Sequence, residues 1–182
     1  EFEDPDNHVE VNYHSWDIGT CIQEIAENSV DTPHLKFLHG APMIPPVEFE
    51  ADGPISKYNI MDGYIWGIGH GPGISETRHN KGDVAMLMFA LSTPVHAELT
   101  RTRMAFTWKK YPEGSEDAKT AEHLYNHSIG EADGEDSAGF ESVDLIVWDN
   151  KKYRPNPLLC DGDGPILRFR EYFKQFYVEG AE

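Results

Sequence analysis

The stretch VAMLMFALSTPVHAELTRTRMAFTW, residues 84–108, decides the fold class. Its first part, VAMLMFAL, is a continuous apolar run, and its last part, RTRMAFTW, alternates between polar and apolar side chains. The alternation places Met104, Phe106 and Trp108 on one face of a strand, as in a sheet that is covered on one side. Residues 47–68 are strand-like as well. Together these runs predict an antiparallel β-sheet.

Helical patterns flank the strand-like runs. Residues 21–39 carry apolar side chains at helical spacing, but Pro33 in the middle favours two short helices over one. We expect Thr32 to cap the second helix and Gly40 to end it. After the sheet, helices are predicted over residues 118–129, 140–148 and 165–177. The expected fold is α+β, a helix-grip arrangement with long C-terminal helices over an apolar cavity.

Two features of the sheet region bear on the expected cavity. The glycine-rich stretch HGPGISETRHN, residues 70–80, is predicted to be a loop and a candidate lid. Large apolar side chains of the two long runs are candidates to line the cavity, although simple core packing explains each of them as well. These candidates are Met86, Met88, Met104, Phe106 and Trp108.

Composition narrows the function classes. The 182 residues suit one domain, and 15 Lys plus Arg against 32 Asp plus Glu give a net charge of -17. This charge would repel nucleic acid, so that class of partner is disfavoured. We find no apolar run of the roughly 20 residues that would span a bilayer. The acidic start, EFED, is unlike a signal peptide, and we expect further sequence upstream of it.

The two cysteines, Cys21 and Cys160, lie far apart and form no C-x-x-C pattern. A disulfide framework and a thiolate zinc site are therefore not indicated, and a cytoplasmic protein is expected. His123 and His127 are four residues apart on a predicted helix, which suits a metal site by spacing alone. No carboxylate follows His123 as in a zinc-protease motif, so a surface helix explains this pair better.

Asp31, His34 and His39 form the cluster with the clearest chemical meaning. Imidazoles bind Fe(II) well, and two of them with one carboxylate leave positions open for other ligands. Five residues on a regular helix separate two side chains by about 140°, so His34 and His39 converge only if the helix is distorted or ends between them. The Asp31 side chain, three residues from His34, could orient that ring by a hydrogen bond. A capped helix with two ordinary histidines is the alternative.

Two longer motifs indicate a family. The run ENSVDTPHLKFLHGAP, residues 27–42, resembles the Asp-x-x-His-x4-His iron motif of Rieske non-haem iron oxygenases. The run VDLIVWDNKKYRPNPLLCDGDGPILRFREYFKQFY, residues 143–177, resembles the end of 3-ketosteroid 9α-hydroxylase oxygenase components and cholesterol 7-desaturases. The resemblance covers essentially the whole chain.

The resemblance implies a set of site residues. His34, His39 and Asp144 would bind one mononuclear Fe(II), and Asp31 would be the bridge for electron transfer from a Rieske cluster. Asn28, within the same motif, joins the catalytic set. If the register of the late helix differs, the alternatives for the carboxylate ligand are Glu141 and Asp149.

The resemblance further implies O2-dependent hydroxylation or desaturation of a steroid or sterol, with a ferredoxin or flavin reductase system as partner and a homotrimeric assembly. One departure matters. The family's Rieske domain holds a [2Fe-2S] cluster through Cys-x-His and Cys-x-x-His, and neither Cys21 nor Cys160 stands in such a motif. Residues 1–182 are therefore expected to be a single mononuclear-iron catalytic domain, with the cluster on a missing domain or a partner.

Two other function classes compete with the oxygenase. A non-catalytic helix-grip module for lipids or sterols would share the cavity and hold no metal. A zinc hydrolase would use the same two imidazoles and one carboxylate, because zinc accepts that ligand set.

Overall fold

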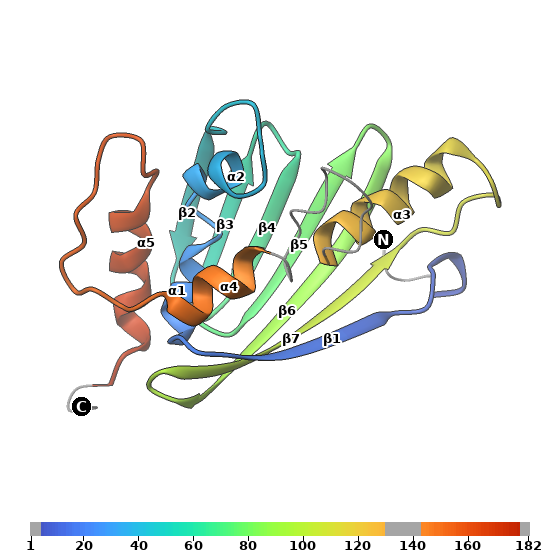
Figure 1. Ribbon diagram of the computed structural model, residues 1–182. Coiled ribbons are helices and arrows are strands. Elements are labelled where there is room, and N and C mark those ends of the chain that lie inside the picture. Colours follow the sequence, from blue (N-terminus) through green and yellow to red (C-terminus); the bar gives the residue numbers. More distant parts are fainter. Residues whose placement is uncertain (1–4, 130–142, 179–182) are drawn as a thin grey trace.

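A computed structural model describes residues 5–129 and 143–178, and its centre is one antiparallel sheet in the order β1-β7-β6-β5-β4-β3-β2 (Figure 1). The strands are β1 Asn12–Ile18, β2 Val47–Asp52, β3 Ile55–Ile60, β4 Ile65–His70, β5 Ile74–Lys81, β6 Val84–His96 and β7 Leu99–Trp108. Successive strands from β2 to β7 pair as hairpins, and β1 pairs with β7 at the far edge. The predicted α+β class with an antiparallel sheet is confirmed.

Short helices complete the fold. They are η1 Pro5–Asn7, α1 Ile22–Glu27, α2 Pro33–Phe37, α3 Glu116–Ile129, α4 Leu145–Asn150, α5 Ile166–Phe173 and η4 Lys174–Phe176. The two short helices predicted within residues 21–39 are confirmed, and Pro33 is the first residue of the second. The side chain of Thr32 makes no capping hydrogen bond, because Thr32 itself has helical backbone angles.

The C-terminal helices differ from the expected long ones. Helix α4 has six residues and α5 has eight. The segment between them is irregular, with bends and a turn, and contains Pro155, Pro157 and Pro165, which restrict the backbone and cannot continue a helix. The apolar stripe predicted over residues 165–177 is present, and it runs from α5 into η4.

The predicted loop and lid over residues 70–80 are wrong. Residues 74–81 form strand β5, which pairs with β4 on one side and β6 on the other. A strand in the interior of a sheet is held by two ladders of hydrogen bonds, and this tertiary pairing overrides the weak local signal. The glycines that indicated a loop, Gly71 and Gly73, stand in the turn before the strand.

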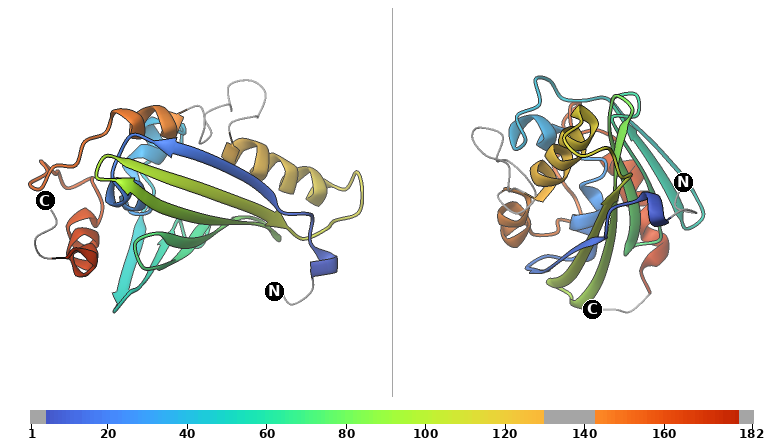
Figure 2. Two further views of the ribbon diagram at one scale, coloured as in Figure 1. Left: turned by 90° about the horizontal axis from the view of Figure 1, so that it is seen from below. Right: turned by 90° about the vertical axis from the view of Figure 1, so that its right-hand side faces the viewer.

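The helices gather on one face of the curved sheet (Figure 2). Helix α5 packs Phe169 and Phe173 against the β2–β3 end, where Phe49 is buried. Helix α3 packs Leu124 against the β6–β7 end, beside Phe106. Helices α1 and α4 lie between these clusters, and the space that remains under them holds the site described next.

Candidate metal centre

Two histidines meet at the end of helix α2. His34 lies in the helix, and His39 follows the last helical residue, Phe37, by two residues. Gly40 has φ +72°, a left-handed conformation that suits glycine and turns the chain away. Because the helix ends between them, the two rings approach to 5.3 Å between centroids at an interplanar angle of 75°.

Asp144 joins this pair from the other end of the chain. It stands immediately before helix α4, is 5% exposed, and places Oδ2 3.1 Å from Nε2 of His39. One ligand atom from each of His34, His39 and Asp144 lies within 4.8 Å of the others. Across the described ranges, 5–129 and 143–178, no other group of three His, Cys, Asp or Glu residues is arranged in this way.

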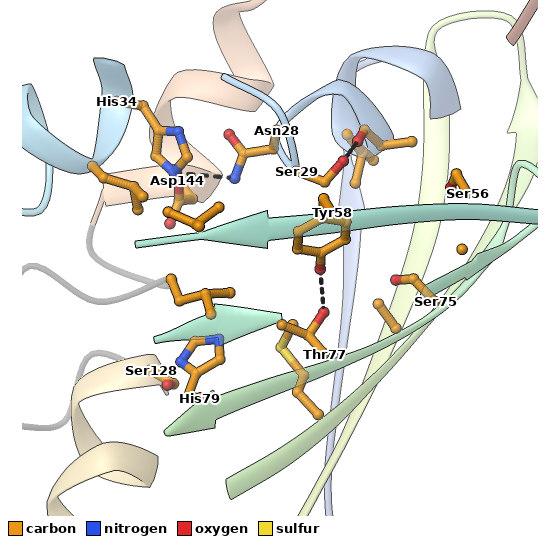
Figure 3. Close-up of a pocket in the computed structure, with 18 of the residues that line it drawn as sticks. Asn28, Ser29, His34, Ser56, Tyr58, Ser75, Thr77, His79, Ser128 and Asp144 are labelled. Carbon is orange, nitrogen blue, oxygen red and sulfur yellow. Dashed lines mark hydrogen bonds between the residues drawn. The ribbon is translucent and has the colours of Figure 1, made fainter. Parts of the chain in front are cut away.

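A backbone contact fixes the ring of His34. Its Nδ1 donates a hydrogen bond to the main-chain carbonyl of Asp31, so Nε2 keeps its lone pair and faces the centre. Nδ2 of Asn28 lies 3.4 Å from that Nε2 (Figure 3). The expected hydrogen bond from the Asp31 side chain is replaced by this main-chain one. Asp31 precedes helix α2, and its main-chain carbonyl is the group that contacts the His34 ring.

Burial sets the protonation state of His34. Desolvation lowers the pKa of its imidazole below the ordinary value of 6.5, and the Asp144 and Asp31 charges oppose that effect only in part. The ring is thereby kept in the neutral form, which is the form that binds metal ions.

The other candidate ligands lie elsewhere. The carboxylate of Asp149 accepts a hydrogen bond from the backbone amide of Gly19 at 2.7 Å and is directed to strand β1. Glu141 lies outside the described residues. His123 and His127 stack on each other along α3, with centroids 6.0 Å apart.

A cavity of about 490 Å³ adjoins the three metal-ligand candidates, within the size range of ligand pockets, about 300–1,000 Å³. Met88 and Met104 line it, as proposed from the sequence. Met86, Phe106 and Trp108 do not line it. They pack in the cluster under α3, where this helix covers the sheet, and Met88 and Met104 contact the same cluster at the side of the cavity.

The sequence interpretation missed several cavity residues. His79 projects from β5 into the cavity, and burial lowers the pKa of its imidazole to about 4. Tyr58 and Trp148 also line the cavity. The signal that could have found His79 is its position in strand β5, where Ser75, Thr77 and His79 are alternate residues and share one face.

Comparison with known proteins identifies the family. The family model for the 3-ketosteroid 9α-hydroxylase C-terminal domain matches residues 1–177. The chain belongs to this family. The resemblance to Rieske oxygenase catalytic domains that the two motifs indicated is thereby confirmed.

Two individual relatives illustrate the similarity. The cholesterol 7-desaturase of Caenorhabditis elegans is 28% identical over 88% of this chain and 43% of its own length. A probable 3-ketosteroid-9-alpha-monooxygenase oxygenase component of Rhodococcus rhodochrous is 49% identical over 22% of this chain and 10% of its own. The chain thus spans less than half the length of these relatives.

Solved structures support the fold of the family member. NdmA of Pseudomonas putida CBB5 superposes with a TM-score of 0.67 at 13% identity, over 95% of this chain and 51% of that one. This likeness concerns the fold alone. In the part of the chain that the structure describes, no helix has the length and apolar character needed to cross a membrane.

Proposed function

We propose that this chain is the mononuclear-iron catalytic domain of a Rieske-type monooxygenase that oxidises a steroid or sterol. One observation carries the proposal: His34, His39 and Asp144 present ligand atoms within 4.8 Å of one another beside a cavity. The family match supports the choice of reaction. The substrate class follows from relatives named for cholesterol and 3-ketosteroids.

The three residues suit iron. Two imidazoles and one carboxylate on one face of a metal are the ligand set of non-haem Fe(II) oxygenases. Bound iron would supply O2-dependent hydroxylation or desaturation. The hydrogen bond from His34 to the Asp31 carbonyl would hold one ligand ring in place, and burial of Asp144 would exclude water from the carboxylate.

Electrons would reach the centre along Asp31. It lies two residues before the first residue of α2, and because its carbonyl holds the His34 ring, its carboxylate is not used for that contact. The donor would be a [2Fe-2S] Rieske cluster on another domain or a partner, supplied by a ferredoxin or flavin reductase system. We further propose a homotrimer in which the cluster of one subunit serves the iron of the next.

A second function has an observation in its favour. A cavity of about 490 Å³ with a largely apolar lining also suits a helix-grip module that binds a lipid or sterol without chemistry. The oxygenase needs a metal, whereas the lipid-binding module does not. A zinc hydrolase, the third possibility, would need a metal but would act without O2.

Metal content separates these functions. Metal-free protein is reconstituted anaerobically with Fe(II) or Zn(II), desalted and analysed for metal per chain. We expect one Fe(II) per wild-type chain and loss of binding in His34→Ala, with His96→Ala as the matched control because His96 is exposed in the β6–β7 hairpin. Equal iron in wild type and His34→Ala would favour the lipid-binding module. Turnover of an ester by the zinc form without O2 would favour the hydrolase.

A further inference from the structure

Four hydroxyl side chains of strands β3 and β5 face the cavity. They are Ser56, Tyr58, Ser75 and Thr77, here called the hydroxyl patch, and Figure 3 shows all four on the cavity wall. None of them was singled out by sequence, and none is needed to hold a metal. Apolar residues such as Ile60 and Met88 lie beside the patch, and His79 stands at the other end of β5.

Glycine on the intervening strand makes room for the patch. Gly67 of β4 is paired with Tyr58 on one side and Thr77 on the other. A Cβ atom at Gly67 would lie 2.3 Å from Cζ of Tyr58, so the tyrosine ring lies across the backbone of β4. Its hydroxyl there forms a buried hydrogen bond with the hydroxyl of Thr77. Such a pair uses one of its two O–H donors, and one remains.

The same arrangement repeats two residues further along the strands. Gly69 is paired with Ser56 and with Ser75, and a Cβ at Gly69 would lie 2.5 Å from Oγ of Ser56. Ser56 lies close enough to the Tyr172 hydroxyl to influence its pKa, and that hydroxyl donates a hydrogen bond to the carbonyl of Pro54. Within residues 5–129 and 143–178, the hydroxyl of Ser75 has no hydrogen-bond partner in the protein, although it lines the cavity. The patch therefore has hydrogen-bonding capacity left for a ligand.

The patch is set apart from the metal centre. His79, whose pKa is affected by the charge of His39, lies at the metal end of β5. Ser75 lies four residues away on the same face, which is about 13 Å at 3.3 Å per residue. Among the described residues 5–129 and 143–178, the lining includes no Lys or Arg, and its one acidic residue, Asp144, is at the metal end. A ligand group at the patch would therefore meet hydroxyls and no opposite charge.

We propose that the hydroxyl patch binds an uncharged oxygen substituent, a hydroxyl or a ketone, on an apolar polycyclic substrate whose reacting carbon lies nearer the metal. Serine and tyrosine hydroxyls donate to a ketone and both donate to and accept from a hydroxyl. The patch would thus suit both a sterol and a 3-ketosteroid. This inference rests on the proposed function for its substrate class, and it adds where and by what groups the oxygen is held.

Ligand binding to the metal-free full chain tests the inference. The probes are cholesterol, cholest-5-ene, which lacks only the hydroxyl, and cholesterol sulfate, each delivered from cyclodextrin. Quenching of tryptophan fluorescence reports binding, because Trp148 lines the cavity. We expect cholesterol to bind about tenfold more tightly than cholest-5-ene, the equivalent of one net hydrogen bond. Cholesterol sulfate is expected to bind more weakly than cholesterol.

Two double variants locate the contact. Ser56→Ala/Ser75→Ala removes one row of hydroxyls, and Tyr58→Phe/Thr77→Val removes the other while leaving no partner unsatisfied. We expect the tenfold preference to disappear in at least one double variant. It should persist in the control Ser15→Ala, since Ser15 is exposed on β1. Circular dichroism and thermal unfolding establish that each variant is folded.

Three results would overturn the inference: no preference in wild type, a preference retained in both double variants, or tighter binding of the sulfate. The test needs neither iron nor electrons, so it is independent of the metal measurement. Loss of the preference in a variant that still binds iron supports the patch within the oxygenase. A preference in a chain that binds no iron leaves the patch in place and removes the oxygenase function.

Discussion

Nδ1 of His34 donates its hydrogen bond to the main-chain carbonyl of Asp31. The contact ties a candidate metal ligand to the backbone of the residue that we propose as the route for electrons. A carbonyl is present whatever side chain Asp31 carries. A substitution at Asp31 can therefore remove the proposed electron route through its side chain while the carbonyl still holds the His34 ring.

We predict that Asp31→Asn keeps the metal and loses electron delivery. Because the carbonyl is retained, iron affinity should fall by much less than the about 10–100-fold that loss of a ligand's orienting partner costs. Iron per chain after anaerobic reconstitution measures this. With a Rieske partner restored, steady-state turnover should be abolished, whereas Asp17→Asn, an exposed residue of β1, should leave it unchanged. Normal turnover of Asp31→Asn would refute the bridging role.

Arg170 of helix α5 is bonded to Glu27, the last residue of helix α1. Its Nε and Nη2 atoms donate to the two carboxylate oxygens of Glu27 at 2.6 and 2.9 Å, and Glu27 is 4% exposed. Arg170→Met would leave this carboxylate buried without its main partner, at a cost of about 3–5 kcal/mol in the free energy of unfolding. Urea denaturation measures the change.

The matched control for Arg170 is Lys174→Met in the next turn. Lys174 pairs with Glu171, but both side chains are largely exposed, so its loss should cost at most about 1 kcal/mol. If Arg170→Met proved no more harmful than Lys174→Met, the buried pair would contribute little to the position of α1.

The sheet could be predicted from the sequence because its two longest strands have hydrophobic patterns typical of β-strands. Residues 84–91 are continuously apolar and residues 101–108 alternate, and both became parts of strands β6 and β7. The meeting of Asp144 with His39 was not accessible from any periodicity. It depends on a contact between the two ends of the chain, and only the resemblance of the motifs indicated it.

The cavity lining was the part that the sequence misplaced. Alternation shows that Met86 and Met88 share a face, and both pack in the cluster under α3. Met86 is fully buried there, whereas Met88 is partly buried and also lines the cavity. Strand β5 was missed for a related reason. The residues ISETRHN are polar, and their strand conformation comes from pairing with β4 and β6.

Gly67 is predicted to be intolerant of a side chain. A Cβ there would lie 2.3 Å from the Tyr58 ring, which cannot move without breaking its hydrogen bond to Thr77. We expect Gly67→Ala to destabilise the protein by about 1–3 kcal/mol through overpacking and to weaken sterol binding. Gly162→Ala is the control, because its Cβ would have no neighbour nearer than 3.9 Å. Equal unfolding free energies for the two variants would show that the ring adjusts freely.

His79 gives the fold a pH dependence of known sign. Burial, with smaller effects of His127 and His39, lowers its pKa from 6.5 to about 4 in the folded chain. Between these values the unfolded chain binds the proton and the folded chain does not, so stability falls as the pH drops from about 6.5 to about 4. Over this whole pH range the free energy of unfolding falls by roughly 3 kcal/mol.

Urea unfolding of the metal-free protein at several pH values should therefore show a shallower decline in His79→Gln than in wild type. His96→Gln, at an exposed position, should retain the wild-type slope. Parallel pH profiles for wild type and His79→Gln would mean that this imidazole titrates normally and that its side of the cavity is open to water.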